Sequence, residues 1–194
     1  DASSYFMLGV GFKMPHLHLH MPKKYYDMYD TPEYDRIFDS LVSEEGRRFP
    51  VNAARMNYRC CADYYFKYMH EKGTAKYKEE DKEYLLDMNH TTSIRMYREL
   101  NKGYAASITF LDVQLGRILD TLDELNLWNN ITIVLTSDHG MHNGEKGLWE
   151  KWTLFDESTL VPLIITNPFI KYKGSHVYQP VELIDVLPTT LDLI

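Results

Sequence analysis

An aspartate and a histidine lie side by side directly after an apolar stretch of the chain. Residues 131–136 are rich in β-branched side chains, and Ser137, Asp138, His139 and Gly140 follow them. Such a run predicts a buried strand, and in open α/β sheets ligands collect at the carboxyl ends of strands. Because a carboxylate and an imidazole at a strand end can both reach one cation, Asp138 and His139 are candidate metal ligands. The alternative is that Asp138 caps the next turn and His139 is a polar loop residue.

Basic side chains elsewhere could bind an anion or a metal. Lys151 lies between two tryptophans after a glycine-containing loop. A lysine packed among aromatic rings offers a fixed positive charge to an anion, whereas an exposed lysine simply covers apolar surface with its stem. His16, His18 and His20 alternate with apolar residues, so an extended backbone would place them on one face. That face is either a metal or anion site or a polar loop edge.

The elements that must position these residues alternate between strand and helix patterns. Apolar residues recur every three or four positions over residues 91–126, which predicts one long helix. Apolar runs predict strands at residues 5–10, 131–136 and 160–166. Residues 181–194 fit a helix that Pro188 either kinks or restarts. This order predicts an α/β fold, a mixed sheet flanked by helices.

The segment between the first run and the long helix is polar, aromatic and weakly periodic. Short helices are expected near residues 23–29 and 80–88, and no regular structure is expected elsewhere in residues 30–89. Cys60 and Cys61 are adjacent, and a disulfide between neighbours is strained. They are either free thiols or pair with a cysteine outside this chain, and no nearby base favours a catalytic thiol.

Composition narrows the function classes. The 194 residues include 44% hydrophobic and 25% charged side chains, as in an ordinary soluble domain. The net charge of -7 argues against a general nucleic-acid binder. Mean hydropathy is -0.39, and no apolar run reaches the roughly 18 residues that a membrane span needs. The chain starts at Asp1 and stops at Ile194 inside an expected helix, so we expect it to belong to a longer protein.

Several segments together resemble the type I sulfatases of the alkaline-phosphatase superfamily, and most of all their iduronate-2-sulfatase branch. The resemblance covers roughly residues 1–29 and 96–194, whereas residues 30–90 do not align. The segments that carry it are G-F-K-M-P-H at 11–16, Y-A-A-S through L-D-V-Q-L-G-R at 104–117, V-L-T-S-D-H-G at 134–140, G-E-K-G-L-W-E-K at 144–151, V-P-L-I at 161–164 and V-E-L-I-D-V-L-P-T at 181–189.

The resemblance implies roles for individual residues. Asp138 and His139 match two ligands of the family's Ca²⁺ ion, although an imidazole would also suit zinc. His16 and Lys151 match residues that contact the sulfate group. His142 either contacts the substrate or faces solvent. A divalent cation and a lysine would offset the negative charge of a sulfate ester.

The resemblance also implies what the chain lacks. The family's nucleophile is a formylglycine made from the cysteine of a C-x-P-x-R stretch. The 194 residues contain no such stretch. We therefore expect residues 1–194 to be the C-terminal portion of a sulfatase catalytic domain. It would need the N-terminal half as its partner and would not hydrolyse sulfate esters alone.

The function expected of the parent protein is hydrolysis of sulfated glycosaminoglycan sugars. A metal-dependent phosphodiesterase or phosphatase of the same superfamily is one alternative, and a non-catalytic truncated paralogue is another. Asn89 and Asn130 each begin a glycosylation sequon, N-H-T and N-I-T. Together with the resemblance, these sequons predict a lysosomal or secreted glycoprotein.

Overall fold

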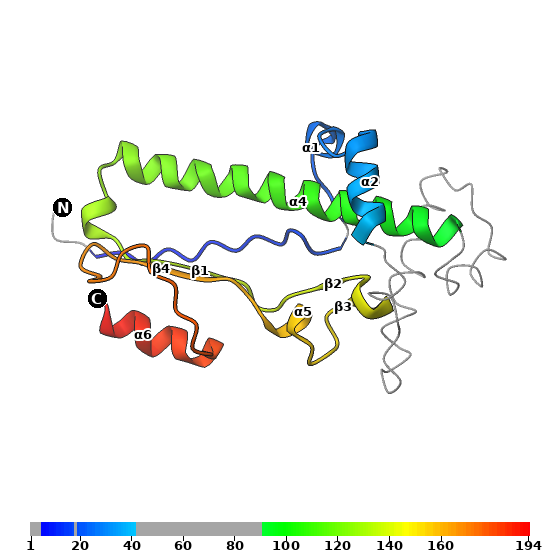
Figure 1. Ribbon diagram of the computed structural model, residues 1–194. Coiled ribbons are helices and arrows are strands. Elements are labelled where there is room, and N and C mark those ends of the chain that lie inside the picture. Colours follow the sequence, from blue (N-terminus) through cyan, green and yellow to red (C-terminus); the bar gives the residue numbers. More distant parts are fainter. Residues whose placement is uncertain (1–4, 18, 42–90) are drawn as a thin grey trace.

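The computed structural model describes residues 5–17, 19–41 and 91–194. One long helix, α4 (Thr91–Glu124), runs along the molecule, and the strands lie between it and the short helix α6 (Val186–Asp192) (Figure 1). Helices on both sides of the strands confirm the expected α/β class. The remaining helices are α1 (Lys23–Asp27), α2 (Pro32–Leu41), α5 (Asp156–Thr159) and the 3-10 turns η3 (Trp128–Asn130), η4 (Glu145–Gly147) and η5 (Leu183–Asp185).

Helix α4 confirms the helix expected over residues 91–126. It ends in a Schellman motif, in which Leu127 N–H donates to the Leu122 carbonyl and Asn126 N–H donates to the Asp123 carbonyl, both at 2.9 Å. Asn126 takes the left-handed conformation that this motif requires, with φ of 55°. The chain then turns through η3 into the first strand.

Two antiparallel pairs of strands follow in the described residues. β1 (Ile133–Thr136) pairs with β4 (Leu163–Thr166), with Ile133 opposite Thr166. β2 (His142–Asn143) pairs with β3 (Trp149–Glu150) in a short hairpin. The strands predicted at residues 131–136 and 160–166 are therefore confirmed, each somewhat shorter than expected.

The buried strand predicted for residues 5–10 is wrong. These residues run as extended chain without strand assignment, and Tyr5 and Met7 are 103% and 95% exposed. An apolar extended segment becomes a strand only when a neighbour supplies ladder hydrogen bonds. Neither described pair of strands includes this segment.

Helix α2 corrects the expectation that residues 30–89 hold no regular structure before residue 80. Pro32 occupies the first helical position, and the Thr31 hydroxyl accepts a 3.4 Å hydrogen bond from Tyr34 N–H. Both are helix-start signals that weak periodicity obscured. The helix expected near 23–29 is confirmed by α1. The one near 80–88 lies outside the described residues, as do His18, Cys60, Cys61 and Asn89.

The helix predicted for residues 181–194 is confirmed in place, and of its two expected forms the structure shows the restart near Pro188. Residues 183–185 form the 3-10 turn η5, and α6 begins at Val186. Pro188 lies in the first turn of α6, where the missing N–H of proline leaves no helical hydrogen bond unmade. A separate helix that starts just before Pro188 therefore replaces a kinked one.

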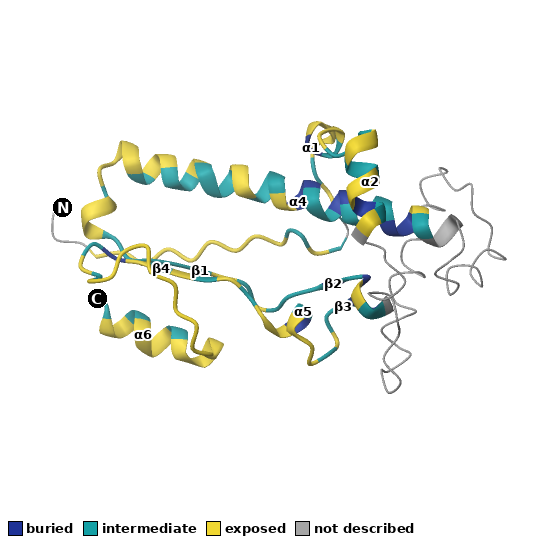
Figure 2. Cartoon of the chain, viewed as in Figure 1, coloured by how far each residue is buried: buried dark blue, intermediate teal, exposed yellow. Residues whose placement is uncertain are grey.

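The buried residues gather at the end of α4 that carries α1, α2 and the β2–β3 hairpin (Figure 2). Tyr25 of α1 packs on Phe110 of α4 with ring centroids 5.2 Å apart. On another side of α4, Tyr97 meets the buried Trp149 edge-on at 5.1 Å. The hairpin that follows Asp138 and His139 is thus anchored to α4 by aromatic packing.

Polar contacts reinforce this packing. Lys102 of α4 is buried and forms ion pairs with Asp30 at 2.9 Å and Asp35 at 2.6 Å, while Arg98 bonds Asp39 through two nitrogens. The hydrogen bond from Lys102 holds the pKa of Asp35 below its ordinary value. None of the described helices is long and apolar enough to cross a membrane.

Candidate metal and anion site

Asp138 and His139 leave the end of β1 as a close pair. The His139 Nε2 atom lies 3.4 Å from Asp138 Oδ2. The Asp138 side chain is 84% exposed and that of His139 is 35% exposed, so both can be reached from solvent. Asp138 Oδ1 also accepts the His139 backbone N–H at 3.1 Å, a contact with the adjacent residue, whereas a turn cap bonds an N–H two or three residues on. The carboxylate therefore keeps its second oxygen beside the imidazole.

The His139 ring is oriented by the backbone. Its Nδ1 lies 2.8 Å from the Gly140 carbonyl oxygen, which can only accept a hydrogen bond. Nδ1 therefore carries a proton, and Nε2 is the ring nitrogen that faces Asp138. Such backbone orientation is characteristic of metal-binding histidines.

The donor set fits a divalent cation. An imidazole nitrogen and a carboxylate oxygen about 3.4 Å apart have the spacing of two ligands that share one ion at roughly 2.1–2.4 Å from each. Within the described residues no group of three or more His, Cys, Asp or Glu side chains forms a fuller site. To hold a cation, the pair would need further donors.

Gly140 fixes the loop that carries this pair. Its N–H donates to the Ser158 carbonyl in α5 at 2.8 Å. A Cβ at this position would overlap the carbonyl oxygen of Glu157. Only glycine lets the loop lie this close to α5, so the glycine of the Asp-His-Gly motif has a packing role.

Lys151 follows β3 and is half-buried. Among the described residues no ion pair neutralises it. Glu150 directly before it has φ of 66°, a left-handed conformation that is uncommon for a residue with a side chain. Of the neighbouring tryptophans, Trp149 is buried and Trp152 is 69% exposed. Lys151 therefore leaves a rigid buried anchor with its charge available to an anion.

His16 is exposed at the end of a turn closed by its own N–H on the Lys13 carbonyl, 2.9 Å away. Its Nδ1 contacts the Leu17 carbonyl oxygen, which leaves Nε2 as the free ring nitrogen. His16 and His139 thus share one arrangement, with Nδ1 bound to the backbone and Nε2 available.

One apolar crevice brings the segments that carry these residues together. Leu17 is adjacent to His16, Met141 follows His139 by two positions, and Trp149 precedes Lys151 by two. No hydrogen bond or ion pair between described residues joins His16 or Lys151 to the Asp138–His139 pair. The structure therefore gathers the segments but leaves the side chains apart. The crevice is lined by Leu17, Leu19, Leu100, Tyr104, Met141, Asn143 and Trp149.

His142 does not face solvent, so that alternative is wrong. The ring has 0% exposure and presents no surface to a substrate in this structure. Its Nε2 lies 2.7 Å from the Thr153 hydroxyl, and its ring meets Phe155 edge-on at 6.0 Å. Burial lowers its pKa, so the ring is held in the neutral form.

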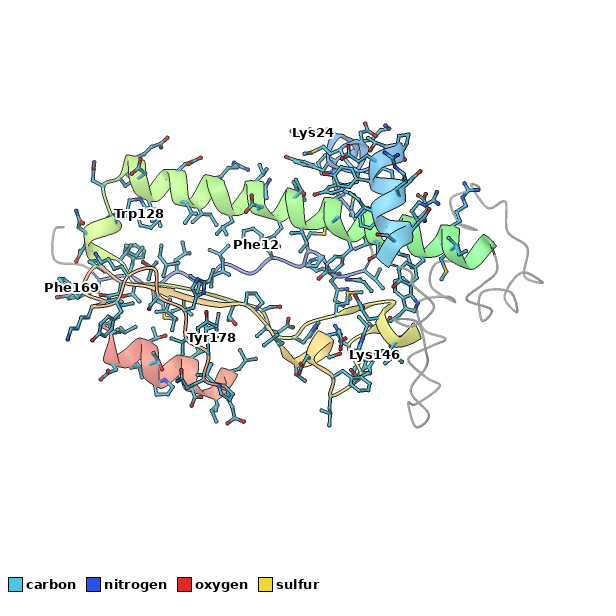
Figure 3. All side chains as sticks on the ribbon, viewed as in Figure 1. Phe12, Lys24, Trp128, Lys146, Phe169 and Tyr178 are labelled. Atoms are coloured by element: carbon cyan, nitrogen blue, oxygen red, sulfur yellow. The ribbon has the colours of Figure 1, made fainter. Side chains whose placement is uncertain are left out.

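Sequence reasoning missed the partners of His142. Thr153 and Ser158 join His142 in a hydrogen-bonded chain, and Lys146 pairs with Glu157 beside it, where Figure 3 shows Lys146 next to the hairpin. Isolated hydroxyl residues carry no sequence signal, because their role depends on what the fold places next to them.

A family model described as sulfatase matches residues 2–194. The chain belongs to the sulfatase family. The resemblance inferred from the sequence segments is thereby confirmed, as is its placement among the type I sulfatases of the alkaline-phosphatase-like superfamily.

Relatives of this sulfatase-family chain are much longer than it is. A sulfatase of Formosa agariphila is 28% identical over 193 residues, which are 97% of this chain and 32% of the relative. The human iduronate 2-sulfatase is 29% identical over 168 residues, 86% of this chain and 27% of the relative. The chain thus spans about a third of the length of the curated relatives it matches.

A solved structure supports the same fold. The phosphonate monoester hydrolase SpPMH from Silicibacter pomeroyi superimposes with a TM-score of 0.59 and 26% identity, covering 92% of this chain and 32% of the other. The α/β arrangement of this sulfatase-family chain is therefore shared with a larger hydrolase.

Proposed function

We propose that the protein acts in the hydrolysis of sulfate esters and that this chain supplies the part of the site that binds the cation and the sulfate group. The observation that carries the proposal is the Asp138–His139 pair in a chain of the sulfatase family. The imidazole Nε2 and the carboxylate oxygen of this pair lie 3.4 Å apart at the end of β1.

Asp138 and His139 would hold a divalent cation, Ca²⁺ or alternatively Zn²⁺. The bound cation would supply a Lewis acid that offsets negative charge on the sulfate oxygens. Lys151, which no described residue neutralises, would offset further charge in the transition state. As an imidazolium, protonated on both ring nitrogens, His16 would donate its Nε2 proton in a hydrogen bond to the anion or transfer it to the leaving oxygen.

These residues account for binding and charge compensation but not for nucleophilic attack. The formylglycine expected of the family requires a C-x-P-x-R stretch, which the 194 residues do not contain. We therefore expect this chain to bind the cation and to need further sequence for turnover.

The substrate proposed for the whole protein is a sulfated glycosaminoglycan sugar, handled in the lysosome or outside the cell. The 29% sequence identity to the human iduronate 2-sulfatase supports a sulfated sugar as the class of substrate. The exposed position of Asn130 in η3 supports glycosylation at its sequon. Asn89 remains a predicted second glycosylation site.

Hydrolysis of a phosphate or phosphonate ester is the second candidate. It is favoured by the structural similarity to a phosphonate monoester hydrolase and by the suitability of a histidine ligand for zinc. The two candidates share the cation pair and differ in the ester that they turn over.

Matched assays separate the two candidates. The longest form of the protein that its gene encodes is assayed with an aryl sulfate and with the matching aryl phosphate. We expect faster sulfate turnover, and faster phosphate turnover would favour the second candidate. Turnover of neither ester, with binding of sulfated sugar that needs no cation, would indicate a non-catalytic paralogue.

A titration tests the cation pair in this chain directly. Calorimetry with Ca²⁺ and Zn²⁺ compares the wild type with Asp138→Asn, and with Asp120→Asn as a control on the exposed surface of α4. We expect Asp138→Asn to lower cation affinity at least about tenfold, because a charged ligand becomes neutral. Equal affinity in the wild type and Asp138→Asn would contradict the proposed ligand role.

A further inference from the structure

A chain of hydrogen-bonded side chains runs from β2 to α5. The His142 Nε2 lies 2.7 Å from the Thr153 Oγ1, and Thr153 Oγ1 lies 2.9 Å from the Ser158 Oγ. Thr153 Oγ1 also accepts the Phe155 N–H at 3.3 Å. The two ends of the chain, His142 and Ser158, are buried at 0% and 4% exposure, and Thr153 between them is half-buried.

The two ends of this polar chain lie beside the two parts of the candidate site. The backbone carbonyl of Ser158, the residue whose hydroxyl ends the chain, accepts the N–H of Gly140, the residue directly after His139, at 2.8 Å. Thr153 follows Lys151 by two residues. The hydrogen bonds therefore connect the loop that carries Asp138 and His139 with the segment that carries Lys151. The side chains of these three residues take no part in those hydrogen bonds.

The arrangement costs stability, which argues that it is not present for stability alone. His142 Nδ1 and Glu157 Oε2 are both buried without a hydrogen-bond partner. An unsatisfied buried polar atom is unfavourable, and apolar side chains of similar size are often at least as stable in such a place. Phe155 lies edge-on to the His142 ring, and the charges of Glu157, Glu145 and Lys146 act on that ring.

We propose that His142, Thr153 and Ser158 are positioning residues that hold the Asp138–Gly140 loop and the Lys151 segment at a fixed separation. The inference deepens the proposed sulfate ester hydrolysis and rests on it for its effect on rate. It explains why a histidine that touches no solvent lies three residues after His139. The coupling between the two segments can be measured by a structural method that needs no enzymatic assay.

The test compares Thr153→Val, which keeps the shape and removes the hydroxyl, with Thr153→Ser, which restores the hydroxyl. Thr190→Val is the matched control, because the Thr190 hydroxyl bonds only the Val186 carbonyl within α6, at 2.7 Å. Amide hydrogen exchange of Gly140 reports on the loop, and the amides of the β1–β4 pair serve as internal reference. Ser158→Ala is a second variant that removes the last hydroxyl of the chain if Thr153→Val does not fold.

We expect exchange at Gly140 to be roughly threefold to tenfold faster in Thr153→Val, the loss expected for one hydrogen bond, with the β1–β4 amides unchanged. In the longest form of the protein, kcat for an aryl sulfate should fall roughly tenfold or more with little change in KM. Thr153→Ser should recover both values and Thr190→Val should alter neither.

Two results would overturn the inference. Unchanged Gly140 exchange in both Thr153→Val and Ser158→Ala would show that the segments are not coupled, whatever the activity. Faster exchange with an unchanged kcat would show that the coupling does not serve the reaction. A wild type without sulfatase activity would instead overturn the proposed function, and Gly140 exchange would still decide whether the two segments are coupled.

Discussion

His139 and His142 lie three residues apart and occupy opposite environments. His139 is partly exposed, with its Nδ1 proton on a carbonyl and Nε2 beside a carboxylate. His142 is fully buried against a threonine hydroxyl and a phenylalanine ring. At the residue scale, the first has the exposure and orientation that the proposed cation site needs, and the second is held neutral by burial.

The neutral His142 predicts that the protein loses stability in mild acid. Burial lowers its pKa, and this outweighs the opposing charges of Glu157 and Glu145. The folded-state pKa of His142 lies below the ordinary value of about 6.5. The free energy that the neutral ring contributes to folding stability is therefore fully present above pH 6.5. It is lost as the pH falls through the folded-state pKa, with a slope of at most about 1.4 kcal/mol per pH unit.

Urea unfolding at low protein concentration, followed by tryptophan fluorescence, measures this dependence between pH 7.5 and about 4.5. His142→Gln should flatten the pH dependence in that range. Glu157 acts at lower pH, because the hydrogen bond from Lys146 lowers its pKa, and its contribution is lost only as the carboxylate protonates. A wild type whose stability is constant across the range would contradict the prediction.

At the element scale, the loop between β1 and β2 is defined by its contact with α5. Gly140 N–H bonds the helix, and no room is left for a Cβ beside the Glu157 carbonyl. A helix of four residues, α5, has little stability of its own. The loop and the helix therefore depend on each other for their position.

Two glycine substitutions should act in opposite directions. Gly140→Ala forces the loop away from α5 and should destabilise the protein by about 1–3 kcal/mol while weakening cation binding. Gly116→Ala lies in α4 with nothing within 4 Å of the added Cβ, and should stabilise by about 0.5–1 kcal/mol through helix propensity. Urea unfolding and a Ca²⁺ titration of each variant check both values. A Gly140→Ala protein with wild-type stability and affinity would refute the packing role.

At the scale of the whole molecule, the described residues expose far more large hydrophobic side chains than they bury. The buried hydrophobic set contains only seven residues, which makes one small core around α4. Exposed members include Leu154 at 94%, Tyr178 at 89% and Phe169 at 84%. Large apolar side chains exposed in this number favour association between molecules.

The purified 194-residue chain is therefore expected to bind a hydrophobic dye and to self-associate as its concentration rises. Dye fluorescence and light scattering over a concentration series test this expectation. A monomer that melts sharply and cooperatively without dye binding would contradict it. Lower dye binding in a longer form of the protein would locate the surface that the additional residues cover.

The sequence by itself determined the family, the α/β class and the elements with the clearest apolar patterns. The helix α4 and the strands β1 and β4 follow from periodicity and β-branched runs, which are local properties of the chain. The family followed from several separate segments whose order and spacing are jointly specific. The Asp138–His139 pair could also be predicted from local sequence, because the two residues are adjacent at the end of a predicted strand and need no fold to bring them together.

Only the tertiary structure decided which residues have partners. Residues 5–10 look like a strand, but a strand also requires a ladder neighbour, which is not a local property. His142 gave no indication of burial, and Thr153 and Ser158 gave no signal at all, because packing brings the three together across 16 residues. The sequence named the residues that could bind a cation and an anion, and the fold showed how buried contacts hold them.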